Sequence, residues 1–141
     1  MSSQSVETGF RIVVSTGKRK TSIARAVIKP GIGRVWINNI PVEILPTEMA
    51  REKIMEPLRL VGGLRNKVDI KVNVRGGGFM SQAEACRIAI ARGLLQYFQS
   101  KELEAIFKEY DRHMLSGDPR RTEPKKWGRY SARRRWQKSY R

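Results

Sequence analysis

The chain has 141 residues, which suits one domain of ordinary size, and it carries 29 lysines and arginines against 13 acidic residues, a net charge of +16 at pH 7. This excess predicts a polyanionic partner. Nucleic acid is favoured over membrane, because no apolar run reaches the roughly 18 residues of a spanning helix and no basic-then-apolar leader is recognised. A single cysteine, Cys86, excludes an internal disulfide and suits a reducing cytosol, and with the single histidine, His113, it cannot build a zinc site.

The first third of the chain predicts three short strands. Residues 1–9 are polar and are expected to form a frayed arm, and residues 16–22 are expected to form a basic turn between the first two strands. Glycines on both sides of Ile32 suit a hairpin loop before the third strand. The expected strands are Phe10–Ser15, Ile23–Lys29 and Arg34–Asn38, with Pro41–Ile44 extending the edge.

The middle of the chain predicts a helix followed by a strand. The helix is expected to start after Thr47, whose side chain can cap it, and to end near Pro57. The residues expected on its buried side are Met49, Ile54 and Leu58. In the strand Val68–Arg75, valine and isoleucine alternate strictly with polar residues that include Asp69, so one face is buried and one is wet.

Two further helices are predicted. Ser81 and Glu84 have the spacing of a capping box, which indicates a helix from Ser81 to about residue 99. Its apolar face includes Cys86 and the small Gly93, which permits close packing against a sheet. Ser100 is expected to cap the next helix, where apolar residues recur at helical spacing: Leu103, Ile106, Phe107 and Tyr110.

These elements predict an α+β domain over residues 10–111. Helices are expected to cover one face of a small, mostly antiparallel sheet, while the other face is polar and meets RNA. Residues 112–141 form a basic tail with eight arginines and three lysines against two acidic residues, a net charge of +9. The tail has no apolar period, so it should not fold alone and needs a polyanion.

The tail's composition favours folding on a defined RNA surface over flexible, non-specific binding. Its arginines can bind phosphates bidentately. Pure charge would not require aromatic residues, and Trp127, Trp136 and Tyr140 can stack on bases or sugars. Thirty extended residues reach on the order of 100 Å, so the tail can contact something remote from the domain.

A second basic cluster, Lys18-Arg19-Lys20 with Arg25 beyond it, lies between the first two strands. A turn there can bring several cations to one phosphate; a merely solvated surface turn is the alternative. Gly17 and Lys18 do not form a P-loop, because the upstream glycine is missing and Arg19 stands where Ser or Thr should follow the lysine.

The three glycines Gly76-Gly77-Gly78 precede a helix and can cradle an anion, although a strand-to-helix turn is the favoured interpretation. Cys86 is expected in the core, Trp36 and Phe79 in the core or at its edge, and His113 has no catalytic role. Two rival functions are a nucleotide-using enzyme with these glycines as its phosphate loop and a non-specific nucleic-acid chaperone. Missing carboxylate–metal pairs and a missing base argue against the enzyme.

Three stretches are more specific than these patterns. They are GKRKTSIAR at residues 17–25, GGGFMSQAEACRIAIARGL at 76–94, and the tail segments DPR at 118–120, KKWGRYSARRR at 125–135 and SYR at 139–141. Together they resemble the family of ribosomal protein nine of the small subunit, over nearly the whole chain from Phe10 onward. The ending Ser139-Tyr140-Arg141 is similar to the archaeal or eukaryotic branch, since the bacterial pattern ends Ser-Lys-Arg.

The resemblance implies a four-stranded sheet backed by helices, with a left-handed βαβ crossover that departs from the usual right-handed rule. It also implies a cytoplasmic, ribosome-bound structural protein without catalysis or cofactors. The implied partners are 16S-type rRNA of the small-subunit head, P-site tRNA and neighbouring head proteins. The residues expected to bind rRNA are Lys18, Arg19, Lys20, Arg25, Arg75, Arg120, Arg121, Lys125, Lys126, Arg129, Arg133, Arg134 and Arg135.

The resemblance further implies that the tail threads through rRNA and that its tip reaches the anticodon stem-loop of P-site tRNA. Arg141 is expected on the tRNA backbone, supported by Lys138 and Tyr140. Tyr140 replaces the penultimate lysine of the bacterial pattern, which favours packing or a hydroxyl hydrogen bond over a second ionic contact.

Overall fold

The computed structural model describes residues 11–141, so the expected arm of residues 1–9 and Phe10 lie outside the described residues. The elements in chain order are β1 (Val13–Arg19), β2 (Ser22–Pro30), β3 (Val35–Ile37), β4 (Ile40–Pro41), α1 (Glu48–Val61), β5 (Val68–Arg75), α2 (Phe79–Phe98), α3 (Lys101–Tyr110) and α4 (His113–Ser116). Two 3-10 turns, Val42–Ile44 and Gly62–Lys67, flank α1.

The strands form one sheet in the spatial order β1-β2-β5-β3-β4. Neighbours pair antiparallel except β3 and β5, which are parallel, so the chain crosses over between them, and α1 lies in that connection. The α+β class with a mixed, mostly antiparallel sheet is therefore confirmed. The resemblance implied four strands, and the structure adds a fifth because Ile40 and Pro41 pair with β3. The left hand of the crossover stays a prediction.

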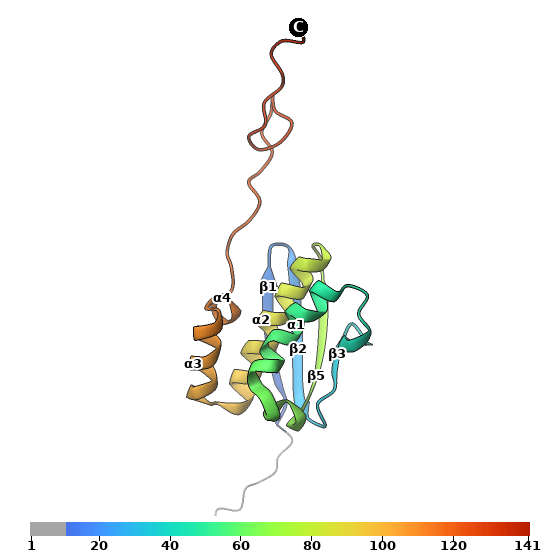
Figure 1. The fold of residues 1–141 in the computed structure, drawn as a ribbon, viewed down its shortest axis with the longest axis vertical. Coiled ribbons are helices and arrows are strands. Elements are labelled where there is room, and N and C mark those ends of the chain that lie inside the picture. Colours follow the sequence, from blue (N-terminus) through green and yellow to red (C-terminus); the bar gives the residue numbers. More distant parts are fainter. Residues whose placement is uncertain (1–10) are drawn as a thin grey trace, which may run out of the picture.

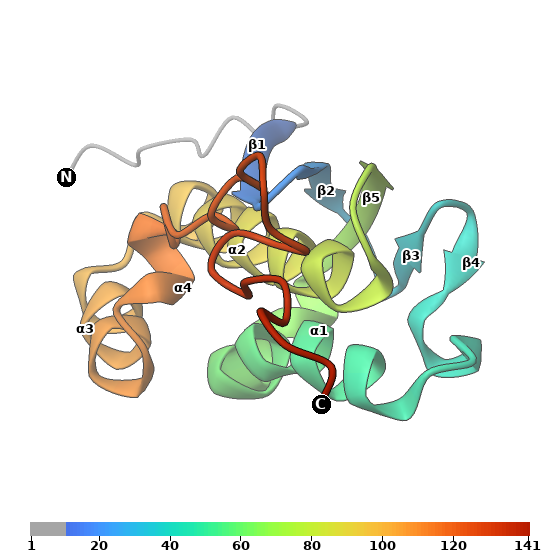
Figure 2. The same ribbon diagram turned by 90° about the horizontal axis from the view of Figure 1, so that it is seen from above.

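Helices α1 and α2 cover one face of this sheet and leave the other face open (Figure 1). Figure 2 shows the strands along one side of the domain and these two helices along the other. The core lies between the two layers. As predicted, β2 contributes the fully buried Ala24, Ala26 and Ile28, and α2 contributes the buried Cys86.

The first strand ends later than the sequence predicts. It continues through Lys18 and Arg19, so the turn to β2 shrinks to Lys20 and Thr21. Gly17 permits this course, because a Cβ there would lie 2.2 Å from the carbonyl oxygen of Ala85 in α2. Strand and helix therefore touch backbone to backbone along this line.

Helix α1 runs through Pro57 to Val61, so the predicted end at Pro57 is wrong. A proline inside a helix costs about 3 kcal/mol. Here Pro57, Leu58 and Val61 are all buried against the core, and this burial offsets the lost hydrogen bond. The predicted burial of Met49 is also wrong, since its side chain is 70% exposed.

The predicted start of the second helix at Ser81 is wrong. Helix α2 begins at Phe79 with Gly78 at its N-cap, and no side chain caps it, so the expected capping box does not form. Phe79 is 62% exposed rather than at the core edge. The predicted start of α3 is confirmed, because the Ser100 hydroxyl accepts a hydrogen bond from the backbone N–H of Leu103 at 3.3 Å.

A short helix follows where the sequence pattern stops. In α4, Met114 is fully buried, and the helix packs against α2 and α3. Beyond it the chain leaves the domain as an extended tail that ends far from the sheet (Figure 1). The first residues of the basic segment are thus fixed to the domain by packing.

Candidate nucleic-acid interface

The predicted basic cluster at the end of β1 divides into two kinds of residue. Lys18 and Lys20 are exposed, and neither forms a salt bridge with any residue between 11 and 141. Lys20 has a positive φ of 53° in the two-residue turn. These two ammonium groups are free to meet an anion.

Arg19 is different, because its guanidinium is already engaged. Its side chain is only 13% exposed, and its Nε lies 2.7 Å from an oxygen of Glu84 in α2. Its Nη2 lies 3.6 Å from Asp118, and its Nη1 donates to the carbonyl oxygen of Arg120 at 3.1 Å. Arg19 therefore ties β1 to α2 and to the base of the tail.

Asp118 is the acidic centre of this connection. Arg120 donates to it from Nε at 3.0 Å and from Nη2 at 2.7 Å, and the backbone N–H of Arg120 adds a third hydrogen bond. These bonds from Arg120, together with the charge of Arg19, hold the pKa of Asp118 well below its ordinary value. The carboxylate stays ionised and keeps the two arginines in place.

The tail base and the β1–β2 turn enclose one groove of about 410 Å³. Two predicted sets of RNA-binding residues, 18–20 and 120–121, thus come together although they are far apart in the sequence. The lining residues are Lys18, Lys20, Arg92, Ser116, Gly117, Asp118, Pro119, Arg120 and Arg121. With five cationic residues and one carboxylate, this groove suits a phosphate group.

Arg92 is a residue of this groove that the sequence reasoning missed. Its Nε donates to the carbonyl oxygen of Leu115 at 2.6 Å, and its Nη1 donates to that of Thr16 at 3.1 Å. The partners lie 23 and 76 residues away along the chain. No local pattern signals a guanidinium that binds distant backbone carbonyls.

The open sheet face carries a second basic area. Arg25 and Arg75 point out of this face, as predicted for a wet surface, and line a groove of about 380 Å³ with Thr16, Ile23, Asn73 and Val74. Lys29 and Lys71 are exposed on the same face and were not among the predicted contacts. Their signal was present, because they continue the alternation that places Arg25 and Arg75 outside.

An aromatic residue adds to this face. Trp36 of β3 is half-buried, and the guanidinium of Arg34 lies 5.0 Å from the centre of its ring. The predicted place of Trp36 in the core or at its edge is wrong, because Trp36 lies beside Lys71 on the open face while its neighbours Val35 and Ile37 point into the core. A polar face with cations and one aromatic ring is chemically suited to RNA.

The remaining predicted residues lie along the tail, away from the domain. Lys125, Lys126, Arg133, Arg134 and Arg135 are exposed, and Arg129 is half-buried. At the tip, Lys138, Tyr140 and Arg141 are exposed too, with Tyr140 at 79%. The structure therefore places the predicted rRNA and tRNA residues in separate stretches of one extended segment.

The glycine run 76–78 and Cys86, which a phosphate loop or a catalytic nucleophile could use, have structural roles instead. Gly76 and Gly77 have φ values of 81° and 64°, and Ser22 Oγ donates to the carbonyl oxygen of Gly76 at 2.8 Å. The glycines are thus the favoured strand-to-helix turn. Burial raises the pKa of the Cys86 thiol to about 12, so Cys86 is a core residue and no nucleophile.

Electrostatics and shape point to one class of partner. The cations gather around the tail base, over the open sheet face and along the tail, where they can neutralise phosphates spaced along a polyanion. Among the helices that the structure describes, none combines the length and apolarity needed to cross a membrane. The arrangement can bind a folded nucleic acid at several points at once.

Comparison with known proteins gives consistent matches. Residues 17–141 match the family of ribosomal protein S9/S16. The chain is 73% identical to the small ribosomal subunit protein uS9 of Desulfurococcus amylolyticus, over 99% of both chains. It is 60% identical to uS9 of Aeropyrum pernix, over 93% of this chain and 97% of the relative. It is 61% identical to uS9 of Pyrobaculum aerophilum, over 93% and 92%. These relatives are archaeal, as the ending Ser139-Tyr140-Arg141 predicts.

Proposed function

This chain belongs to the ribosomal protein S9/S16 family, and on that premise we propose that it binds rRNA in the head of the small ribosomal subunit and contacts P-site tRNA through its C-terminal tip. The family is structural rather than enzymatic, so the chain is a ribosomal protein without catalytic activity. The rRNA and tRNA contacts, and any contacts with neighbouring head proteins, are the part that we propose.

The domain is the anchor in this proposal. Lys18 and Lys20 contact rRNA phosphates beside the tail base, and Arg25 and Arg75 do so on the open sheet face. Arg19 contributes indirectly, because its guanidinium is already paired with the carboxylates of Glu84 and Asp118. It holds the tail base next to the lysines, so that both bind the same RNA region.

The tail carries the distinctive part of the proposal. All of its cations but the half-buried Arg129 are exposed, and the segment extends away from the domain (Figure 1). A chain of this form is stable only when RNA surrounds it, since it buries little apolar surface of its own. The stretch from Arg120 to Arg135 lies in rRNA, and the last four residues, Lys138 to Arg141, reach a second and exchangeable RNA.

Deletion of Lys138–Arg141 tests the tRNA contact. We expect subunits that contain the shortened protein to assemble normally, because the domain and the rest of the tail are intact. Their affinity for P-site tRNA should fall roughly tenfold, which corresponds to the loss of one or two charge-assisted hydrogen bonds. Filter binding of tRNA to purified subunits measures this change.

A point substitution beside the tip is the control for non-specific effects of changing this end of the chain. The substitution Gln137→Ala changes an uncharged neighbour of the tip and should leave tRNA affinity as in the wild type. Unchanged tRNA affinity after the deletion would remove the role assigned to the tip. A non-specific chaperone would instead bind unrelated RNAs as tightly as the rRNA head region, so competition between such RNAs tests the anchor separately.

A further inference from the structure

Part of the tail has a defined local structure, which we call the aromatic loop, residues 127–136. The backbone N–H of Tyr130 donates to the carbonyl oxygen of Arg134 at 3.0 Å, and Arg129 and Arg135 pair as an isolated bridge. The rings of Tyr130 and Trp136 are in contact, with their centres 3.9 Å apart and their planes tilted by 43°. The guanidinium of Arg134 lies 5.3 Å from the Tyr130 ring, so the loop closes on an aromatic pair.

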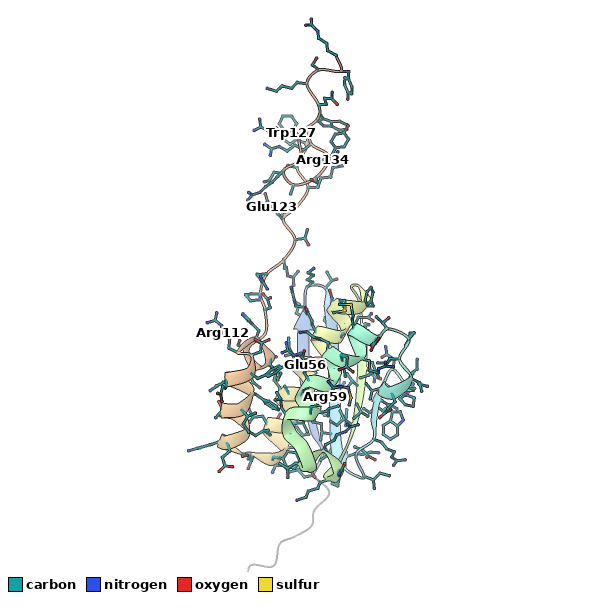
Figure 3. The ribbon with its side chains drawn as sticks, in the orientation of Figure 1. Glu56, Arg59, Arg112, Glu123, Trp127 and Arg134 are labelled. Atoms are coloured by element: carbon teal, nitrogen blue, oxygen red, sulfur yellow. The ribbon has the colours of Figure 1, made fainter. Side chains whose placement is uncertain are left out.

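An acidic residue ties this loop to the preceding chain. Glu123 accepts a hydrogen bond from Arg133 Nε at 2.9 Å and pairs with the ammonium group of Lys126. These partners hold the pKa of Glu123 below its ordinary value, with the hydrogen bond from Lys126 as the largest cause. Figure 3 shows Glu123 on the domain side of the loop that carries Trp127 and Arg134. The loop is thus closed at its base as well as at its centre.

Trp127 is the aromatic side chain of the loop that the loop itself does not use. It is 95% exposed, whereas Tyr130 is 47% exposed and Trp136 is 52% exposed. Gly128 follows with a φ of 70°, a conformation that favours glycine and turns the chain directly after the indole. The tail therefore presents one large flat ring to its surroundings.

This indole lines one side of an open cationic groove of about 720 Å³. Five of the lining residues are basic and none is acidic: Lys125, Lys126, Trp127, Gly128, Arg129, Arg135, Trp136 and Lys138. Among residues 11–141, no carboxylate forms a salt bridge with Lys125, Arg129 or Arg135. Free cations beside a free aromatic face are the two elements by which proteins hold single-stranded nucleic acid.

We propose that Trp127 is the stacking platform for one unpaired RNA base, with the flanking phosphates bound by Lys125, Arg129 and Arg135. The proposal rests on the proposed function, because it takes for granted that the tail binds RNA. It also assigns different roles to the aromatic residues of the loop. The Tyr130–Trp136 pair shapes the loop, and Trp127 supplies the contact with the base.

The test compares two oligomers with the full-length protein. One is a hexamer of uridine, and the other is a hexamer with the same phosphates but abasic riboses. Fluorescence anisotropy of end-labelled oligomers at several salt concentrations gives both affinity and salt slope. We expect the uridine hexamer to bind roughly 5- to 100-fold more tightly than the abasic one, the range expected for stacking of one base. The salt slopes should match, because the phosphates are equal in number.

Substitutions then assign the preference to one ring. Trp127→Ala should abolish the preference for uridine and leave the salt slope unchanged, and Trp127→Phe should retain most of the preference. Phe79→Ala is the matched control, since Phe79 is an exposed aromatic residue on the domain outside the proposed contacts. Position 127 is too exposed for these changes to unfold the domain.

Other results would overturn the proposal in distinguishable ways. Equal binding of both oligomers by the wild type would exclude stacking while the ionic tail contacts remain. An equal loss for both oligomers in Trp127→Ala would show that the indole shapes the loop and holds no base. Failure of the wild type to bind either oligomer, even at low salt, would contradict the RNA-binding function of the tail itself.

Discussion

At the scale of single residues, Asp69 shows how a buried charge fixes a loop. It belongs to the polar half of the β5 alternation and was expected on the wet face, yet it is only 3% exposed. The loop after β2 folds over it, and Oδ1 accepts hydrogen bonds from the backbone N–H groups of Ile32, Gly33 and Arg34 at 3.0–3.1 Å. Its second oxygen accepts from Arg34 Nη2 at 3.1 Å.

The substitution Asp69→Ala should destabilise the domain by about 1–3 kcal/mol, because three N–H donors lose their acceptor. Burial alone would raise the pKa of Asp69, but the hydrogen bonds and the Arg34 charge outweigh it and lower this pKa. The unfolded chain therefore binds the proton more tightly, and stability rises with pH. Urea unfolding should show the full contribution above about pH 4, the unfolded value, and its loss as pH falls further.

Asp69→Asn is the control for that experiment, since its amide keeps an acceptor oxygen but does not titrate in this range. Other carboxylates contribute to the acid limb of both proteins, so the difference between wild type and Asp69→Asn isolates this group. A difference that stays constant from pH 7 to pH 2 would contradict the assigned role of the charge.

At the scale of elements, two glycines let the sheet and α2 approach each other closely. A Cβ at Gly17 would meet two backbone atoms of α2, Ala85 O at 2.2 Å and Ala89 N at 2.6 Å. A Cβ at Gly93 would meet side-chain atoms, Ile28 Cδ1 at 2.5 Å and Ser15 Oγ at 2.7 Å. Backbone inside a packed helix cannot shift alone, whereas the end of an isoleucine can turn away.

Gly17→Ala should therefore cost more stability than Gly93→Ala. For Gly17→Ala we expect about 1–3 kcal/mol or more, the usual range for overpacking. At Gly93 the gain in helix propensity, about 1 kcal/mol, offsets part of the clash. Thermal unfolding of both variants gives the order, and a smaller loss for Gly17→Ala would show that α2 moves away from β1 as a rigid body.

Elements whose pattern is local could be predicted from the sequence. The strand Val68–Arg75, the buried face of β2 and the Ser100 cap all depend on neighbouring residues. The predicted element bounds were wrong where contacts with residues distant in the sequence determine where an element ends. Pro57 remains helical because the core buries it, and β1 extends because Gly17 meets α2. The capping-box spacing at Ser81 was misleading, because the glycine turn starts the helix earlier.

At the scale of the whole molecule, the base of the tail is fastened to the domain, so in the proposed function the two bind RNA as one surface. Charge alone predicted a polyanion, and the resemblance predicted where the tail goes. Neither could show that Arg19 of β1 reaches the carbonyl oxygen of Arg120, 101 residues later in the chain. Such pairings depend on the fold, so three adjacent basic residues that look equivalent in sequence have different roles.

This difference can be measured with Lys18→Gln, Arg19→Gln and Lys20→Gln, three substitutions that each remove one charge. The RNA is a transcript of the head region of an archaeal small-subunit rRNA, and affinity is measured over a range of salt concentrations. Each lysine variant should lower the salt slope by about 1, because one phosphate contact is lost. Arg19→Gln should leave the slope nearly unchanged, because its guanidinium faces Glu84 and Asp118.

Arg19→Gln should act instead on the tail base. With the tie to Asp118 and Arg120 removed, trypsin should cleave after Arg120 and Arg121 faster in the free protein than it does in either lysine variant. The affinity for the rRNA transcript should then fall because the tail base is no longer held in place. This loss should be equal at low and high salt. If Arg19→Gln instead lowered the salt slope as much as Lys18→Gln and left the rate of trypsin cleavage unchanged, Arg19 would have to leave its carboxylate partners and bind RNA directly.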